Sequence, residues 1–274
     1  MVNKDIYQKP KTICKTLTDE EAYLMNLSDL DFIAIQKKEI EDELKKHDYE
    51  IRTSNYDDIN ALWSFTEARY VKLEGNELSA YDYYRFIKFG TGLILHKKEE
   101  ICACVFEIAY DKPQRTSYPL RLVLDESIKG NNVGLLMVLY LSLIAKKRGS
   151  EINRSVISFD NHISLYVQVN KQGWVLNGVN PNIKGLTNYF EACLPLSKTG
   201  LMQNKIDMQK LVDFIKTHVR GQDYLLIECN NLEAVQDCFQ KNYLITALIR
   251  EGIIDNKNYF FAMPAEELGY DLVS

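Results

Sequence analysis

Short hydrophobic runs alternate with amphipathic segments along most of the chain, which predicts strands and helices in succession. After a polar start, the charged run KKEIEDELKK (37–46) places opposite charges four residues apart, as on a solvent-facing helix. The stretch YEIRT (49–53) then alternates like a strand, and a helix pattern follows it with Ser54 or Asn55 as a natural N-cap. Two strand patterns, TGLILHK (91–97) and ICACVFEIAY (101–110), flank a polar turn and predict a hairpin.

The next strand pattern, YPLRLVL (118–124), leads through a glycine-bearing turn into one of the most apolar helical segments of the chain. This helix is expected to end at the cations and the glycine of KKRG (146–149). A further strand (155–159), a helix (161–173) and a hairpin built from WVLNG and NYFEACLPL follow. The order β-α-β-β-β-α-β-α-β-β over residues 49 to 197 predicts a mixed α/β layer structure.

The last quarter of the chain repeats part of this order. Matching residues lie at nearly constant offsets of 72, 70 and 69 (220−148, 231−161, 243−174): Arg148 with Arg220, Asn161 with Asn231, and Trp174 with Tyr243. A duplicated half-domain is one interpretation, and two similar strand-helix units that arose by chance is the other. Because no glycine-bearing turn precedes the helix pattern at 208–219, we expect this second unit to be a scaffold or a lid and not a second active site.

Composition narrows the class of protein. With 274 residues, 46% of them hydrophobic and 26% charged, the chain has the composition of a globular protein with a packed core. A net charge of −5 and a pI near 5.5 argue against a general nucleic-acid binder. The N-terminus lacks an apolar signal segment, so we expect a cytoplasmic protein. The longest apolar run, 133–145, is shorter than the roughly 20 residues of a membrane span.

The spacing of cysteines and histidines does not support a metal site. Six cysteines are scattered along the chain, and the two close ones, Cys102 and Cys104, would face the same side of a strand, which is poor geometry for a disulfide. The four histidines lie far apart, without a paired ligand motif. We therefore expect reduced, buried thiols and no metal.

The turn DESIKGNNVGLL (125–136) is the segment that points to chemistry. A strand, a glycine-bearing turn and a helix start place backbone N–H donors around an anionic group, so this pattern predicts phosphate binding. Lys129 to Gly134 resemble the Q/R-x-x-G-x-G/A loop of the GNAT superfamily of N-acyltransferases, whose backbone amides hold the pyrophosphate of coenzyme A (CoA). Lys129 replaces the usual Gln or Arg, and Asn132 replaces the first glycine of G-x-G, although asparagine tolerates left-handed backbone. A valine at Gly134 is expected to obstruct the pyrophosphate and to leave the fold largely intact.

A second segment adds to the resemblance. SFDNHISLYVQVNKQGW (158–174) is similar to the family signature N-x-x-A-x-x-L-Y-x-K-x-G-F, and four of its residues match that signature: Asn161, Lys171, Gly173 and Trp174. The position of the family's catalytic tyrosine falls on Val169, whereas the tyrosine of this segment is Tyr166. These two positions share a helix face, so Tyr166 is either the general acid after a one-turn shift or a packed aromatic residue.

The resemblance implies a set of site residues. The strand before the loop would pair with the pantetheine arm in a splayed gap between the fourth and fifth strands, and the implied cofactor-binding residues are Leu122, Val123, Leu124, Lys129, Gly130, Asn131, Asn132, Val133, Gly134, Leu135 and Asn161. Tyr166 is the candidate general acid, and Glu107 and Asp125 are the candidate bases, with water as the alternative proton carrier. Both acids also have the simpler interpretation of ordinary surface carboxylates. Aromatic residues either line the acceptor site or pack a helix pair: Trp63, Tyr70, Tyr81, Tyr83 and Tyr84.

These observations predict a GNAT-like mixed sheet flanked by helices, with a second, partial GNAT-like αβαββ unit at the C-terminus. The expected domains are a helical extension (1–48), an acyltransferase domain (49–197) and the partial repeat (198–274). The expected activity is transfer of an acetyl group from acetyl-CoA to an amine of a small molecule or a protein. The alternatives are a catalytically degenerate CoA-binding or protein-interaction module, and an enzyme of the same fold that uses a longer acyl donor or an aminoacyl donor.

Overall fold

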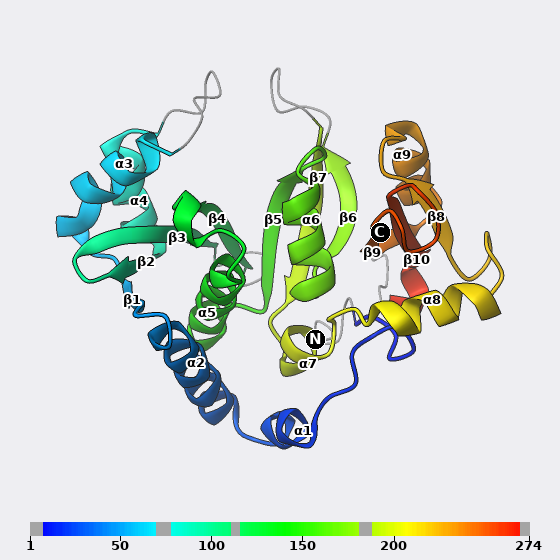
Figure 1. Ribbon diagram of the computed structural model, residues 1–274, viewed down its shortest axis with the longest axis horizontal. Coiled ribbons are helices and arrows are strands. Elements are labelled where there is room, and N and C mark those ends of the chain that lie inside the picture. The colour runs from blue at the N-terminus through cyan, green and yellow to red at the C-terminus, as the bar shows by residue number, and fades with distance from the viewer. Residues whose placement is uncertain (1–7, 70–77, 111–115, 181–187, 269–274) are drawn as a thin grey trace. The chain divides into compact units, whose positions relative to one another are not determined.

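The computed structural model describes residues 8–69, 78–110, 116–180 and 188–268, and its mixed α/β class confirms the prediction. The chain forms two compact units, one of Leu27–Asn153 and one that combines Met1–Asn26 with Arg154–Ser274. Figure 1 labels the helices and strands of both. The division between the units falls inside a strand at Asn153, whereas the domain boundaries at 48 and 197 stay predictions.

The unit Leu27–Asn153 contains a sheet with helices packed on it. Its elements are α2 (Asp29–Lys45), β1 (Glu50–Thr53), the 3-10 turn η1 (Tyr56–Asp58), α3 (Ile59–Glu67), α4 (Ala80–Phe89), β2 (Gly90–Lys97), β3 (Glu100–Tyr110), β4 (Thr116–Leu124), η2 (Glu126–Ile128), α5 (Val133–Lys147) and the first two residues of β5 (Ile152–Ser158). The strands lie in the order β1-β2-β3-β4 with antiparallel neighbours. β4 then pairs in parallel with β5, Thr116 with Ile152 and Ser117 with Asn153.

The charged N-terminal helix α2 is part of this unit and packs along α5 (Figure 1). Its apolar face is buried at Phe32, Ile40 and Leu44, among others, while the charges of KKEIEDELKK occupy the other faces. The hydroxyl of Tyr140 on α5 donates to Glu41 Oε1 at 2.6 Å. The solvent-facing interpretation of this run is therefore correct for one face only, because the opposite face contributes to the core.

The second unit is built around a sheet of six strands in the order β5-β7-β6-β9-β10-β8. Its elements are α1 (Asp19–Met25), the rest of β5, α6 (His162–Tyr166), the π-helical turn η3 (Val167–Lys171), β6 (Val175–Asn180), β7 (Tyr189–Pro195), α7 (Lys198–Met202), α8 (Met208–Thr217), β8 (Leu225–Glu228), α9 (Leu232–Gln240), β9 (Tyr243–Ile249), β10 (Tyr259–Pro264) and η4 (Ala265–Leu268). β6 and β9 meet as antiparallel neighbours at Leu176 and Ile245.

Two halves of this six-stranded sheet have parallel features. Each half places its third strand between the other two, as β5-β7-β6 and β8-β10-β9. Asn161 and Asn231 both N-cap the helix that follows the first strand, accepting from the backbone N–H three residues on. A β-bulge lies at Asn177 in β6 and at Thr246 in β9, again 69 residues apart (246−177). These features favour the predicted echo, and the origin of the echo by duplication stays a prediction.

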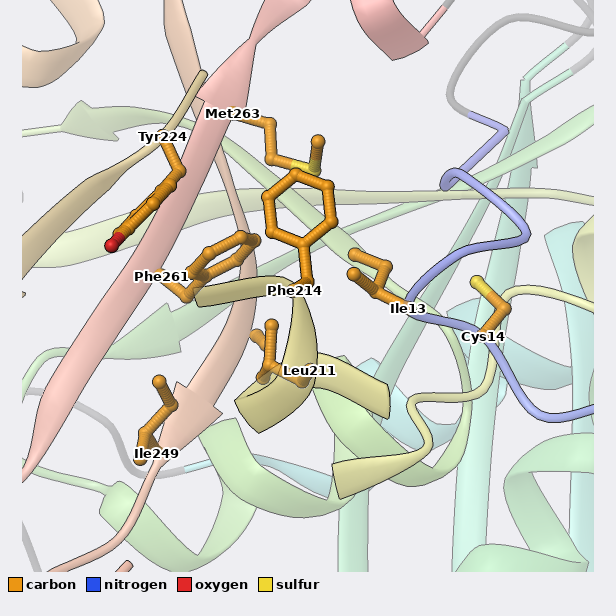
Figure 2. Close-up of a cluster of buried hydrophobic side chains, with 9 residues drawn as sticks. Ile13, Cys14, Leu211, Phe214, Tyr224, Ile249, Phe261 and Met263 are labelled. Atoms are coloured by element: carbon orange, nitrogen blue, oxygen red, sulfur yellow. The ribbon is translucent and has the colours of Figure 1, made fainter. Parts of the chain in front are cut away.

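The N-terminal segment is an integral part of the second unit. Ile13 and Cys14 are buried in one apolar cluster with Leu211 and Phe214 of α8 and Phe261 of β10 (Figure 2). Backbone hydrogen bonds fix the segment there, since Lys15 N donates to Lys205 O at 2.8 Å and Asp207 N donates to Ile13 O at 3.0 Å. The first residues therefore complete a core that the C-terminal half begins.

One lysine is buried with this segment. Lys9 is 1% exposed, and its Nζ donates to the carbonyl of Val169 in η3 at 2.7 Å, while its backbone N–H donates to Asn204 Oδ1 at 3.0 Å. Burial lowers the pKa of Lys9 to about 7, because an ammonium group loses its hydration there.

We predict that Lys9 makes the stability of the protein depend on pH. The pKa of Lys9 is about 7 in the folded chain against an ordinary value of 10.5, so between these values the unfolded chain binds more protons and stability rises with pH. In urea titrations, the free energy of unfolding of the wild-type protein relative to Lys9→Met should rise by about 1 kcal/mol per pH unit between about pH 7.5 and 9.5. Methionine keeps the length of the side chain but does not ionise, so the difference isolates Lys9. A difference that stays constant over this range would contradict the prediction.

Candidate functional site

The loop between β4 and α5 forms a concave array of backbone amides. Gly130 and Asn132 both have left-handed backbone, with φ of +87° and +58°, and α5 begins directly after them at Val133. The first intrahelical bond runs from Leu136 N to Asn132 O at 3.0 Å, and the side chain of Asn132 does not cap the helix. Because the first N–H groups of a helix have no intrahelical acceptor, the amides at this end are directed out of the helix. Alternating backbone handedness next to a helix N-terminus makes a nest for an anion.

The start of α5 lies against β4 because residue 134 is a glycine. Gly134 is buried, and a Cβ at this position would lie 3.1 Å from Leu122 Cδ2 and 3.1 Å from Leu124 Cδ1. The missing side chain therefore lets the first turn of the helix approach the strand closely. The role predicted for Gly134 beside a phosphate is thus joined by a packing role, and a valine here would meet the side chains of the strand first.

The end of β4 that leads into the loop differs from a regular strand. Arg121 and Leu122 together face Val105 of β3, so β4 has a bulge there, and Arg121 has a φ of +54°. Within the described residues of the unit Leu27–Asn153, β4 pairs with β5 at Thr116 and Ser117, and no pair on that side involves Leu122, Val123 or Leu124. The side chain of Leu122 is 39% exposed. The strand edge beside the nest is therefore available for pairing with an extended ligand.

These residues fit the CoA molecule that the resemblance implies. The nest offers amide donors and the positive end of a 15-residue helix, α5, which suits a pyrophosphate. Lys129 adds an ammonium group, which contacts Glu126 in an ion pair whose carboxylate is 84% exposed. Such an exposed pair contributes little and exchanges readily for a phosphate. The free edge of β4 suits the amide groups of pantetheine.

Asp125, a candidate base, is held as a loop anchor. Its Oδ1 accepts from the backbone N–H and the hydroxyl of Ser127, and its Oδ2 accepts from Arg69 Nε at 3.0 Å and Nη2 at 2.6 Å. The hydrogen bonds from Ser127 and Arg69 lower the pKa of Asp125 to about 2. A carboxylate held in this way is a weak base, and its contacts tie the loop to the end of α3.

Glu107, the other candidate base, lies in a buried polar network. It is fully buried, accepts a hydrogen bond from the Ser117 hydroxyl, and pairs with Arg148 Nη2 at 2.7 Å. Arg148 Nη1 also donates to Thr91 Oγ1 at 3.0 Å, so the network joins β2, β3 and β4 to the C-terminal end of α5. Arg148 terminates α5 at the end opposite the nest, and these contacts describe a structural ion pair rather than a base open to a substrate.

Tyr166 and the second signature belong to the other unit. Tyr166 ends α6, is half-buried, and carries the guanidinium of Arg250 over its ring, with Cζ 3.9 Å from the ring centroid. Val169 is 1% exposed and lies in the core. Directly after Tyr166 the chain forms the π-helical turn η3, which contains Val169 and changes the register of the side chains that follow Tyr166. Asn161 serves as the N-cap of α6, since its Oδ1 accepts from Ser164 N at 3.0 Å.

The aromatic residues of α3 and α4 divide into two groups. Tyr83 is 2% exposed and packs edge-on against Phe106 at 5.4 Å, so it is a core residue. Tyr81 is 67% exposed and stacks on Tyr84, which in turn stacks on Tyr56. Trp63 is partly exposed at 36%, and Tyr70 lies outside the described residues. The helix-packing interpretation therefore holds for Tyr83, and Tyr81 and Tyr84 stand on the surface.

Sequence reasoning missed three arginines that organise these surroundings: Arg69, which holds Asp125; Arg121, in the bulge of β4; and Arg250, on the ring of Tyr166. Arg69 and Arg250 are distant in sequence from the groups they contact. The sequence around Arg121 does not indicate the bulge either, because arginine rarely adopts a positive φ.

The cysteines, the potential metal ligands and the lengths of the helices bear on three further expectations from the sequence. All six cysteines are thiols, and five of them are buried. In the described ranges, no group of three His, Cys, Asp or Glu side chains gathers in a way that could hold a metal ion. Of the helices that the structure describes, none is both long and apolar enough to cross a membrane.

Comparison with solved structures finds GNAT-type acetyltransferases. The ribosomal-protein-S18-alanine N-acetyltransferase from Escherichia coli is 15% identical, with a TM-score of 0.43, over 54% of this chain and 94% of that chain. A GNAT-family acetyltransferase from Streptococcus pneumoniae is 16% identical, with a TM-score of 0.46, over 54% of this chain and 98% of that one. The NatC complex bound to Gag peptide and CoA is 10% identical, with a TM-score of 0.47, over 54% and 98%.

The chain is similar to these structures over about half of its length. No family model and no curated protein matches the chain.

We predict that Gly134→Val destabilises the unit Leu27–Asn153, in contrast to the expectation from sequence. The added methyl groups would overlap Leu122 and Leu124, which are 3.1 Å from an ideal Cβ, and overpacking of this kind costs about 1–3 kcal/mol. Leu135→Val, one residue along the same helix, controls for the lower helix propensity of valine. Urea denaturation should show that Leu124→Ala relieves the cost of Gly134→Val. Strictly additive effects of these two substitutions would contradict the packing role.

Proposed function

We propose that the chain is a CoA-dependent N-acyltransferase that moves an acetyl group from acetyl-CoA to an amine. The observation that carries the proposal is the conjunction, in one unit, of the nest at Gly130 and Asn132, the N-terminus of α5, and the bulged edge of β4 at Leu122 to Leu124. A nest alone indicates only an anion. A nest followed along the same strand by an open edge suits a ligand that joins a pyrophosphate to an extended amide chain.

In this proposal, CoA supplies an acyl group as a thioester. The amides of Gly130 to Leu135 and the ammonium of Lys129 bind the pyrophosphate, and the edge of β4 orients the pantetheine arm and offers N–H donors to the thioester carbonyl. The neutral amine attacks that carbonyl, an N–C bond forms, the C–S bond breaks, and the sulfur leaves with the bonding electrons. The amine then loses a proton and the thiolate gains one.

We assign the return of the proton to Tyr166 and the removal of the proton from the amine to water. Asp125 and Glu107 are each committed to arginine partners, which favours water over either carboxylate. We also propose that the protein acts in the cytoplasm, where six thiols stay reduced, and that its acceptor is a small molecule or a protein.

We predict that Gly130→Val weakens CoA binding by roughly tenfold to a hundredfold, because valine does not hold a φ of +87° and the nest would lose charge-assisted hydrogen bonds. Gly221→Val is the matched control: Gly221 has a φ of +89° and, like Gly130, open space around its missing Cβ. Calorimetric titration with CoA and acetyl-CoA should show micromolar binding in the wild-type protein and in Gly221→Val. If Gly130→Val and Gly221→Val bound CoA equally well, the assignment of the pyrophosphate to this loop would be wrong.

Turnover separates the enzyme from the alternatives. Thiol release from acetyl-CoA in the presence of amines is expected for the enzyme, and Tyr166→Phe should reduce kcat while CoA affinity is retained. Binding without thiol release from any acyl-CoA would favour the degenerate CoA-binding module. Release from long-chain acyl-CoA alone would favour the enzyme with a different donor.

A further inference from the structure

Two cations converge on Tyr166 in the second unit. Arg250, the first residue after β9, stacks its guanidinium on the ring with Cζ 3.9 Å from the centroid. Lys171, at the end of η3, places Nζ 5.8 Å from the same centroid. Both side chains are exposed, and Tyr166 is half-buried. One aromatic ring with a hydroxyl is therefore flanked by two positive charges.

The side chain of Asn170 links the two backbone segments that carry these cations. This residue is 2% exposed, and its side chain pairs with the backbone of β9 in both directions: Nδ2 donates to Leu248 O at 2.8 Å, and Oδ1 accepts from Leu248 N at 2.8 Å. Lys171 is the next residue after Asn170, and Arg250 is two residues after Leu248. The two segments that carry the cations are thus joined by a buried pair of hydrogen bonds, which limits their relative movement.

In the part of the chain that the structure describes, neither Arg250 nor Lys171 takes part in a salt bridge, whereas Lys241 on the nearby helix α9 pairs with Asp237 at 2.7 Å. A guanidinium that stacks by its face keeps the N–H donors along its edge, and this edge matches the two oxygens of a carboxylate or a phosphate.

We propose that Arg250 and Lys171, held beside the Tyr166 ring, form a binding site for an oxyanion, a carboxylate or a phosphate, that is carried by the amine acceptor. The identification of the ligand as an acceptor rests on the proposed function, because Tyr166 is there the acid that protonates the leaving sulfur. The site makes the C-terminal half a contributor to substrate choice, since Arg250 comes from β9. The acceptor is then an acidic amine, in which the reactive nitrogen and an anionic group belong to one molecule or one peptide.

The first experiment tests the anion site without turnover. Arginine side-chain Nε–H resonances are followed by NMR during titration with inorganic phosphate and, separately, with acetate, at constant chloride. The resonance that is absent in Arg250→Gln should shift and saturate with at least one of these anions. Arg220→Gln is the control, because Arg220 is also exposed and its Nη2 donates only to a backbone carbonyl, Leu226 O, at 3.1 Å. No saturable shift of the Arg250 resonance with either anion would overturn the proposal.

The second experiment tests the acceptor. Matched amines differ only in the anionic group: L-lysine against 1,5-diaminopentane, and phosphoethanolamine against ethylamine. At least one anionic amine should have the higher kcat/KM of its pair, and Arg250→Gln should raise the KM of that amine roughly tenfold to a hundredfold more than the KM of its uncharged partner. The assignment to the acceptor would be overturned if Arg250→Gln kept the preference for the anionic amine. It would also be overturned if the uncharged amine had an equal kcat/KM in both pairs.

A third arm distinguishes an anion of the donor from an anion of the acceptor. CoA and 3′-dephospho-CoA are titrated into the wild-type protein and Arg250→Gln. Equal CoA affinity in both proteins is expected; a loss that is confined to CoA and absent for dephospho-CoA would show that the site holds the phosphate of the donor, and the acceptor proposal would fail. Saturable anion binding at Arg250 in a protein that does not bind CoA would instead contradict the proposed function and leave the anion site standing.

Discussion

The close approach of α5 to β4 is the constraint on which the candidate site depends. Leu122 Cδ2 and Leu124 Cδ1 lie 3.1 Å from the position that a Cβ of residue 134 would take, so a side chain there would have to displace these methyl groups for the first turn of the helix to rest on the strand. That contact places the outward-directed amides of the helix start beside the free edge of β4. Gly130 and Asn132, between β4 and α5, have left-handed backbone, which lets the chain turn from the strand into the helix within a few residues. The site is therefore set by backbone geometry, and side chains such as Lys129 add charge to it.

A similar principle operates in the second unit, where buried polar groups fix a segment that carries exposed ones. The π-helical turn after Tyr166 is held from two sides, by Lys9 at the carbonyl of Val169 and by the side chain of Asn170 at Leu248. Each contact links this turn to a part of the chain more than 75 residues away, since their sequence separations are 160 and 78. The N-terminal segment and β9 thus both form hydrogen bonds that fix the π-helical turn η3. The C-terminal half thus supports the turn after Tyr166 and supplies Arg250.

Local patterns in the sequence predict much of this fold. The strand–turn–helix order around Gly130 and the stop of α5 at Gly149 depend on neighbouring residues, which a sequence displays directly. The same reasoning fails for Glu107 and Asp125, because their roles depend on Arg148 and Arg69, which approach from elsewhere in the fold. Tyr83 and Tyr81 are two residues apart and look equivalent in the sequence, and only the packing of α4 makes one a core residue and the other a surface residue. Gly134 is the instructive case, because a motif indicated that glycine was needed and the structure gives a packing reason.

The most direct test of the central claim is hydrogen–deuterium exchange with and without CoA. If the nest holds the pyrophosphate, amides at the start of α5, from Asn131 to Leu135, should exchange more slowly when CoA is present, because the phosphate oxygens would accept their hydrogen bonds. The start of helix α9 at Asn231 to Val235, which lacks a glycine-bearing turn, serves as the control and should exchange at the same rate in both samples. Unchanged exchange at residues 131–135 under conditions where CoA is bound, or protection at residues 231–235 instead, would contradict the account.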